Sequence, residues 1–313
     1  MNIENSIMVT VWCTVYNHEP YIRDCLEGFV NQKTNFRYEV VVHDDASTDK
    51  SAAIIQQYAE KYPDIIKPIL QTENQYSKKN GAIRRIREEN SRGKYVAICE
   101  GDDYWTDPHK LQEQVDFMES HPEYSLACTD AVVLSGKTEL DWHRYDNDCE
   151  ISLEDIIHKR GAWIYTASML YRKHLLDDYP VFAQKCHVGD YPKAIHLALR
   201  GKVYFFAKKM VTYRYLTPGS WSSTTRIDES YFPKWLSEIR MLQGYNQDSG
   251  EQYHKYFERV MGKLAVFYLR HVPGMMDEVL SALPNFPKWL DIGDKIKWFC
   301  IRLGLKSKKN KQG

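Results

Sequence analysis

Two pairs of adjacent aspartates each follow an apolar run of this 313-residue chain, at the point where a β-strand would end. Asp44 and Asp45 follow the run Tyr38–His43, and Asp102 and Asp103 follow a second apolar run and a glycine. A carboxylate in such a place can accept hydrogen bonds from a pyrimidine N–H or from ribose hydroxyls. Adjacent carboxylates can also bind a hard divalent cation, with water and substrate phosphates completing its shell. The pairs therefore indicate a nucleotide site and a metal site.

A third acidic residue, Asp190, stands in the segment Cys186–Tyr191, directly before a helical pattern that contains Ala194 and Ile195. A carboxylate at this position can act as a general base that removes a proton from an acceptor hydroxyl. The alternative is that Asp190 only caps the helix that follows it.

The two aspartate pairs also have ordinary structural interpretations. Ser47 and Asp49 are good helix-capping residues, so the acids after the first run could serve only to begin a helix. The sequence Gly101-Asp102-Asp103 is common turn chemistry, in which an aspartate bonds to its own backbone. Taken singly, neither pair decides between a structural and a functional role.

The elements that would position these residues follow an alternating pattern. Residues 1–123 predict four strands and four helices, with the strands at 7–16, 38–43, 65–71 and 95–100 and the helices from Pro20, at 47–62, at 82–90 and from Pro108. Such alternation predicts a parallel sheet with right-handed crossovers. Ligands of open α/β sheets bind outside the carboxyl ends of the strands, where the aspartates fall.

The pattern changes after residue 123. Strands are predicted at 125–134, 166–171 and 202–216, alternating with helices at 153–158 and 191–200, and only helices from 228 to 305. The predicted fold class is α/β, a mixed Rossmann-like sheet flanked by helices with a helical C-terminal extension. The expected domains are a catalytic domain over 1–225, divided into a nucleotide-binding half (1–123) and an acceptor half (124–225), and an extension over 226–313 with a basic tail.

The composition excludes several classes of protein. Lys+Arg and Asp+Glu both total 42, which argues against a protein that binds nucleic acid by bulk charge. The seven cysteines include no C-x-x-C pair, which is typical of reduced thiols and not of a zinc site or disulfide framework. No signal peptide and no run of 18 apolar residues is evident, so the expected location is the cytoplasm.

The three acidic elements, with their flanking residues, resemble those of the family 2 glycosyltransferases, which have the GT-A fold. Thr14–Asn17 is similar to the end of the family's first strand, and Val40–Asp49 to its Val-Asp-Asp-Gly-Ser-Thr-Asp stretch. Tyr95–Asp103 resembles its strand-borne Asp-x-Asp-type motif, and Pro108–Leu111 the helix that usually follows. The resemblance covers roughly residues 5–225.

The resemblance implies roles for individual residues. Asp45 would hold the nucleotide base, Asp102 the ribose or diphosphate, and Asp103 the metal ion. The matching positions also assign nucleotide contacts to Tyr16, Asp44 and Arg214, of which the arginine suits bidentate contact with phosphate. Asp190 matches the catalytic base, although the family often shows Glu-Asp there and this chain has Gly189-Asp190.

By this resemblance the chain is an inverting glycosyltransferase of the hexosyltransferase class that moves one sugar from a UDP-linked donor. The expected cofactor is Mn²⁺ or Mg²⁺, and the expected acceptor is a glycan or lipid-linked glycan in bacterial surface polysaccharide synthesis. The chain lacks the Gln-x-x-Arg-Trp motif of processive synthases. The alternatives are a non-catalytic subunit that binds sugar nucleotides, or a nucleotidyltransferase, which should show a glycine-rich loop after the first strand.

The C-terminal region predicts an amphipathic helix, with Trp289, Ile292, Ile296, Phe299 and Leu303 on one stripe. Lysines lie among these residues and follow them in the tail. Such a helix can lie peripherally on the inner face of a membrane with anionic lipid. The alternative is that the stripe packs on the catalytic domain. The acids Asp291 and Asp294 favour this alternative over membrane contact.

Overall fold

The computed structural model describes residues 6–78, 81–142, 144–160, 164–218 and 220–304. These residues form two compact units that interleave along the chain. The first unit comprises 1–152, 161–179 and 197–224, and the second comprises 153–160, 180–196 and 225–313. Each unit is described by itself. Among the described residues no helix has both the length and the apolar composition needed to cross a membrane.

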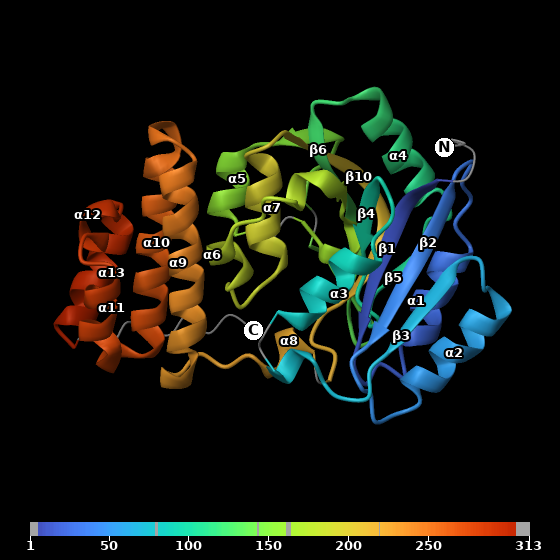
Figure 1. Cartoon of the computed structure of the whole chain (residues 1–313). Helices are drawn as coiled ribbons and strands as arrows, with labels where there is room; N and C mark the ends of the chain where they lie inside the picture. The colour runs from blue at the N-terminus through green and yellow to red at the C-terminus, as the bar shows by residue number, and fades with distance from the viewer. Residues whose placement is uncertain (1–5, 79–80, 143, 161–163, 219, 305–313) are drawn as a thin grey trace. The chain divides into compact units, whose positions relative to one another are not determined.

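The first unit contains the whole sheet (Figure 1). Its strands are β1 (Ile7–Val15), β2 (Arg37–Asp44), β3 (Ile66–Leu70), β4 (Tyr95–Ile98), β5 (Tyr104–Trp105), β6 (Tyr124–Ser135), β7 (Thr138–Leu140), β8 (Cys149–Ile151), β9 (Leu170–Arg172) and β10 (Lys202–Arg214). The main order is β3-β2-β1-β4-β9-β6-β10-β5. The first four strands are parallel, whereas β9 is antiparallel to both of its neighbours. The mixed α/β sheet expected from the sequence is therefore confirmed.

Three helices of this unit cover one face of the sheet. Its helices are α1 (Ile22–Val30), α2 (Ser51–Lys61), α3 (Ala82–Asn90), α4 (Lys110–Ser120), the short α8 (Trp221–Thr224) and the 3-10 turns at Tyr76–Lys78, Thr166–Ser168 and Lys173–Leu176. Apolar side chains of α1, α2 and α4 form one core with inward residues of β1, β2 and β4, among them Val11, Val42 and Ala97. Figure 1 shows α3 on the opposite side of these strands from α1 and α2.

In the described residues of the second unit we find helices and no strand. These helices are α5 (Leu153–His158), α6 (Val181–Gln184), α7 (Asp190–Ala198), α9 (Phe232–Asp248), α10 (Glu251–His271), α11 (Met276–Ala282), α12 (Phe286–Trp289), α13 (Ile292–Arg302) and the 3-10 turns Glu229–Tyr231 and Pro273–Met275; the last two residues of α7 belong to the first unit. Helix α10 packs against α5, α9, α12 and α13. Its Tyr268 stacks on Trp235 of α9, with ring centroids 5.5 Å apart. The helical character expected after residue 228 is confirmed.

Among the element boundaries that differ from the sequence prediction, two have a clear local cause. Helix α2 begins at Ser51 and not at Ser47, because the side chains of Ser47 and Asp49 are used in the turn before it. Residues 166–168 form a 3-10 turn, and the strand β9 begins only at Leu170. There the backbone N–H and the hydroxyl of Ser168 both donate to the carbonyl of Tyr165, which closes a turn in place of an extended strand.

Candidate active site

The ends of β1, β2 and β4 bring the predicted acidic segments to one edge of the sheet. Val15 pairs with Asp44 across the parallel strands, and the N–H of Asp45 donates to the carbonyl of Val15 at 2.9 Å. On the other side of β1, the N–H of Gly101 donates to the carbonyl of Thr14 at 3.0 Å. The three segments that follow these strands therefore begin side by side, as expected for the carboxyl ends of a parallel sheet.

Asp44 is buried and closes the turn after β2. Its carboxylate accepts from the backbone N–H of Ser47 at 2.9 Å and from the Ser47 hydroxyl at 2.5 Å. The same hydroxyl oxygen accepts from the N–H of Asn17, whose side chain accepts from the N–H of Thr48. Ala46 has a φ of 63° in this turn, a left-handed conformation that costs an alanine about 1–2 kcal/mol. The sequence prediction placed Ala46 where the family shows glycine.

Asp45 is also buried, and its carboxylate holds the segment after β3. Oδ1 accepts from the N–H of Gln75 at 2.7 Å, and Oδ2 accepts from the N–H of Tyr76 at 3.0 Å. The Asn74 side chain donates to the backbone carbonyl of Asp45. A carboxylate has about four lone-pair sites, so these two bonds leave acceptor capacity on Asp45. Tyr16, which follows β1, exposes 48% of its surface at the same edge.

Asp103 is 3% exposed, and its Oδ1 accepts from the backbone N–H of Arg214 at 2.8 Å. Burial, together with the carboxylates of Asp102 and Glu100, raises the pKa of Asp103 well above its ordinary value, although Arg214 acts in the opposite direction. A buried carboxyl beside two further acids is therefore electrostatically suited to a cation, which would compensate their charge.

The side chain of Arg214, at the end of β10, connects three elements of the first unit. It donates from Nη1 to the carbonyl of Asp102 at 2.7 Å and from Nη2 to Asp24 of α1 at 2.5 Å. Its guanidinium also lies over the ring of Tyr104, 4.4 Å from the centroid. Thr217, just beyond β10, donates to the Asp102 carboxylate at 3.2 Å. Arg214 thus positions the loop that carries both acids.

The described residues offer a partial set of metal ligands. No group of three or more His, Cys, Asp and Glu side chains converges as a metal site within the described ranges. Asp103 with Asp102 nevertheless fits a divalent cation of the magnesium or manganese type. Such an ion is often held by one or two carboxylates, with phosphate oxygens and water as its other ligands.

His18 lies between the two acidic loops, although the sequence analysis did not single it out. Its ring Nδ1 has no hydrogen-bond partner among the described residues. This nitrogen lies so close to Gly101 that a Cβ built on the glycine would be 2.8 Å from it. Burial lowers the pKa of His18, although Asp102, Asp49 and Asp44 act in the opposite direction. The feature of the sequence that could have identified His18 is its position directly after Tyr16-Asn17.

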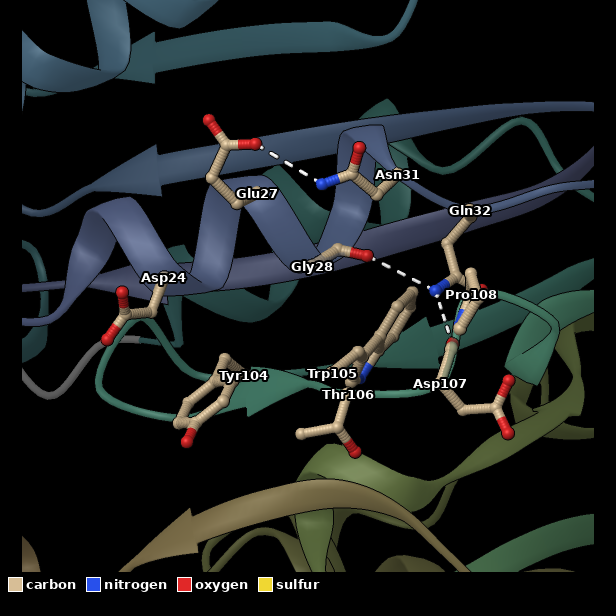
Figure 2. Close-up of a pocket in the computed structure, with 10 residues that line it drawn as sticks. All are labelled: Asp24, Glu27, Gly28, Asn31, Gln32, Tyr104, Trp105, Thr106, Asp107 and Pro108. Carbon is tan, nitrogen blue, oxygen red and sulfur yellow. Dashed lines mark hydrogen bonds between the residues drawn. The ribbon is translucent and has the colours of Figure 1, made fainter.

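A separate hollow of about 480 Å³ runs between α1 and β5 in the first unit. Figure 2 shows Asp24 and Tyr104 at one end of it and Gln32 and Pro108 at the other. Its carboxylates are engaged by protein groups: Asp24 by Arg214, Glu27 by the hydroxyl of Tyr58, and Asp107 by Lys208. None of the predicted site residues lines this hollow.

Asp190 belongs to the second unit, where it begins α7, and its surroundings can be described only within that unit. Its Oδ1 accepts from the N–H of Tyr191 at 2.8 Å. The segment around it is held by hydrogen bonds to α5 and α9. Tyr191 donates its hydroxyl to the carbonyl of Ile157, Tyr245 donates its own to the carbonyl of Pro192, and the N–H of His187 donates to the hydroxyl of Ser237.

An ion pair between the exposed Arg160 and the buried Glu238 lies in the same part of the second unit. Arg160 donates to both carboxylate oxygens of Glu238, with both distances 2.8 Å, and it does so from a left-handed φ of 53°. Burial raises the pKa of Glu238, the guanidinium of Arg160 opposes the shift, and Asp190 adds to it. Neither Arg160 nor Glu238 was found from the sequence, because their separation of 78 residues follows no motif.

Comparison with known proteins agrees with this geometry. The family model described as glycosyl transferase family 2 matches residues 10–180. An uncharacterized protein of Mycobacterium tuberculosis is 30% identical over 300 residues, covering 90% of this chain and 82% of its own. A putative teichuronic acid biosynthesis glycosyltransferase of Bacillus subtilis is 33% identical over 134 residues, covering 41% of this chain and 50% of its own.

Two solved structures share the fold. Residues 1–349 of TarS from S. aureus, in complex with UDP-GlcNAc, give a TM-score of 0.61 at 16% identity, covering 95% of this chain and 92% of that one. In a longer TarS structure the match spans 53% of that chain. A mannosyltransferase of Pyrobaculum calidifontis, in complex with GDP-Man and Mn²⁺, gives a TM-score of 0.57 at 16% identity, covering 97% and 81%. The match to the family model over more than half of the chain, on a mixed sheet of this topology, shows that the chain belongs to glycosyl transferase family 2 and is a glycosyltransferase with the GT-A fold.

Proposed function

We propose that this glycosyltransferase moves one sugar from a UDP-linked donor to an acceptor hydroxyl, with a divalent metal and with inversion at the anomeric carbon. The observation that carries the proposal is the convergence of the Asp45 and Asp103 segments at the edge formed by β1, β2 and β4. Open α/β sheets bind nucleotides at such an edge. The TarS structure with UDP-GlcNAc supports a uridine nucleotide.

The nucleotide contacts come from residues of the first unit. The exposed ring of Tyr16 is available to stack on a base. Asp45 keeps acceptor capacity for a base N–H, while Asp44 keeps the turn around it in shape through Ser47. Asp102 faces the ribose and diphosphate. Arg214 contributes by holding the Asp102 loop and by balancing negative charge near the phosphates.

Asp103, with help from Asp102, would hold Mn²⁺ or Mg²⁺ together with the donor phosphates. When bound, the ion stabilises the negative charge that develops on the departing diphosphate. The burial of Asp103 and the N–H of Arg214 fix the orientation of this carboxylate before the donor arrives. The mannosyltransferase structure with GDP-Man and Mn²⁺ supports a metal of this type.

Asp190 is the base. Its carboxylate takes the proton of the acceptor hydroxyl while the hydroxyl oxygen forms a bond to the anomeric carbon. The bond from that carbon to the diphosphate oxygen breaks on the opposite face, which inverts the configuration. Within the second unit, α5 and α9 hold the Asp190 segment for this task.

We assign the acceptor to the glycans of a bacterial surface polymer, carried on a lipid at the inner face of the membrane. The named function of the Bacillus subtilis relative supports this class. The enzyme would then work from the cytoplasm with peripheral membrane contact.

A thermal-shift screen tests the nucleotide and metal assignments. UDP, GDP and ADP are each added with Mn²⁺, with Mg²⁺ or with a chelator. A ligand at about 100 times its Kd should stabilise the protein by about 2.7 kcal/mol. We expect a shift for UDP with metal and little for UDP with chelator. A thermal shift with GDP but not with UDP would overturn the choice of uridine. An equal shift for UDP with chelator and with metal would overturn the metal assignment.

A further inference from the structure

Helix α13 leaves its apolar stripe uncovered. Ile292 is 80% exposed, Ile296 60%, Phe299 57% and Leu303 56%, and they recur at steps of four, three and four residues along one face. Asp294 is the buried residue on this helix. Within the second unit, the other described helices leave these four side chains largely exposed.

The charges around the stripe are positive. Lys295 and Arg302 flank it on the helix, and both are exposed. The acids at the start of the helix are engaged by basic groups: Asp291 by Arg259 at 3.1 Å, and Asp294 by Lys297 at 2.7 Å. Asp291 also caps the helix by accepting from the N–H of Asp294. Because both acids are paired with basic groups, they should repel a negatively charged partner less than unpaired acids would.

The chain continues past α13 with more positive charge. Residues 305–313 lie outside the described ranges, and their sequence has no acid and four lysines, at 306, 308, 309 and 311. The whole chain carries 42 basic and 42 acidic residues, so attraction to an anionic surface must come from such a local concentration. A hollow of about 430 Å³ beside the stripe, lined by Pro287, Trp298 and Phe299 among others, extends the apolar surface.

We infer that the stripe on α13 docks the enzyme on an anionic phospholipid surface, with Ile296 and Phe299 entering the headgroup boundary and Lys295 and Arg302 bound to lipid phosphates. An exposed apolar face with basic flanks is the arrangement that binds such an interface. The inference rests on the proposed function in one respect: docking would bring the enzyme to the lipid-linked acceptor proposed above.

Flotation of the full chain with vesicles tests the inference. The vesicles are pure phosphatidylcholine, or equal parts phosphatidylcholine and phosphatidylglycerol, at low and at high salt. We expect binding to the anionic vesicles at low salt and little to the neutral ones. The double change Ile296→Ser with Phe299→Ser should weaken binding on the order of tenfold per side chain. Val181→Ser, at an equally exposed apolar residue off the stripe, is the control and should change nothing.

A second pair of variants tests the charges. Lys295→Ala with Arg302→Ala should weaken binding by about fivefold per residue, whereas Lys255→Ala on α10 should not. Failure of the full chain to float with anionic vesicles at low salt overturns the inference. Unchanged flotation of the variant with Ile296→Ser and Phe299→Ser also overturns it. A third contrary result is a full chain that does not bind lipid but forms a concentration-dependent dimer in sedimentation, which this variant abolishes. UDP-dependent thermal shifts, measured on every variant, report separately on the proposed function.

Discussion

The two units position their candidate site carboxylates in different ways. In the first, Asp45 and Asp103 follow β2 and β4, the parallel strands on either side of β1, and the backbone N–H groups of Gln75 and Arg214 orient their carboxylates. In the second, Asp190 begins a helix whose segment is held by hydrogen bonds to the carbonyl of Ile157 in α5 and to the hydroxyl of Ser237 in α9. The first arrangement comes from sheet topology and tolerates changes in side chains far away. The second depends on side-chain hydroxyls contributed by other helices, so it should be the more sensitive to substitution of those side chains.

The sharpest test of this comparison is Asp190→Asn. Loss of a general base should reduce transfer by roughly 10²–10⁴-fold while donor affinity stays unchanged, because we place the donor on the first unit. Steady-state kinetics and UDP titration measure the two effects. Asp64→Asn, at an exposed acid of the first unit, is the control. An equal loss of donor binding would assign Asp190 a structural or nucleotide role.

Asp103→Asn should differ by weakening donor binding as well as transfer, since we place this residue on the donor side. We expect metal-dependent UDP binding to weaken and transfer to fall by roughly 10²–10³-fold, as for loss of one preorganised electrostatic contact. Thermal shifts with UDP across a Mn²⁺ series measure the binding. Normal transfer with the same ion dependence would show that Asp103 only shapes its turn.

Glu238→Gln tests whether remote packing controls the base. The change weakens the pairing with Arg160, so the Asp190 segment should lose its fixed position, and kcat should fall by roughly 10–100-fold with the KM for donor unchanged. Asp248→Asn, at the exposed end of α9, is the matched control. A loss of thermal stability with normal kcat in the folded fraction would reduce the ion pair to a structural role.

The smallest effect is expected at Ala46. Ala46→Gly removes the left-handed strain of about 1–2 kcal/mol but frees the unfolded chain by about 0.4–1 kcal/mol, so the protein should gain about 0.5–1 kcal/mol. Ala53→Gly in α2 provides the contrast, because a helical glycine should cost about 1 kcal/mol. Urea unfolding of the three proteins measures the difference. A destabilised Ala46→Gly variant would mean that the alanine methyl packs usefully in the turn.

The sequence predicted the first unit better than the second for a physical reason. Strand ends and the turns after them are encoded locally, so Asp44, Asp45, Asp102 and Asp103 were found together with the elements that carry them. The position of Asp190 at the head of a helix was also local and was predicted. Its supports were not, because Ile157 and Ser237 meet its segment only through tertiary packing. The short β5, β7 and β8 were missed as well, since two or three residues carry no periodicity.

The separation of Arg160 from Glu238 has a consequence during protein synthesis. A ribosome adds roughly 5–20 residues per second, so the 78 residues between the two partners take roughly 4–16 s to make. The strands that carry Asp45 and Asp103 emerge before α9 does. A nascent chain can therefore form its nucleotide-binding edge while the segment around Asp190 still lacks its support. Under the proposed function, the order of synthesis thus delays catalytic competence at least until α9 has left the ribosome, and a chain truncated before α9 should bind donor without transferring sugar.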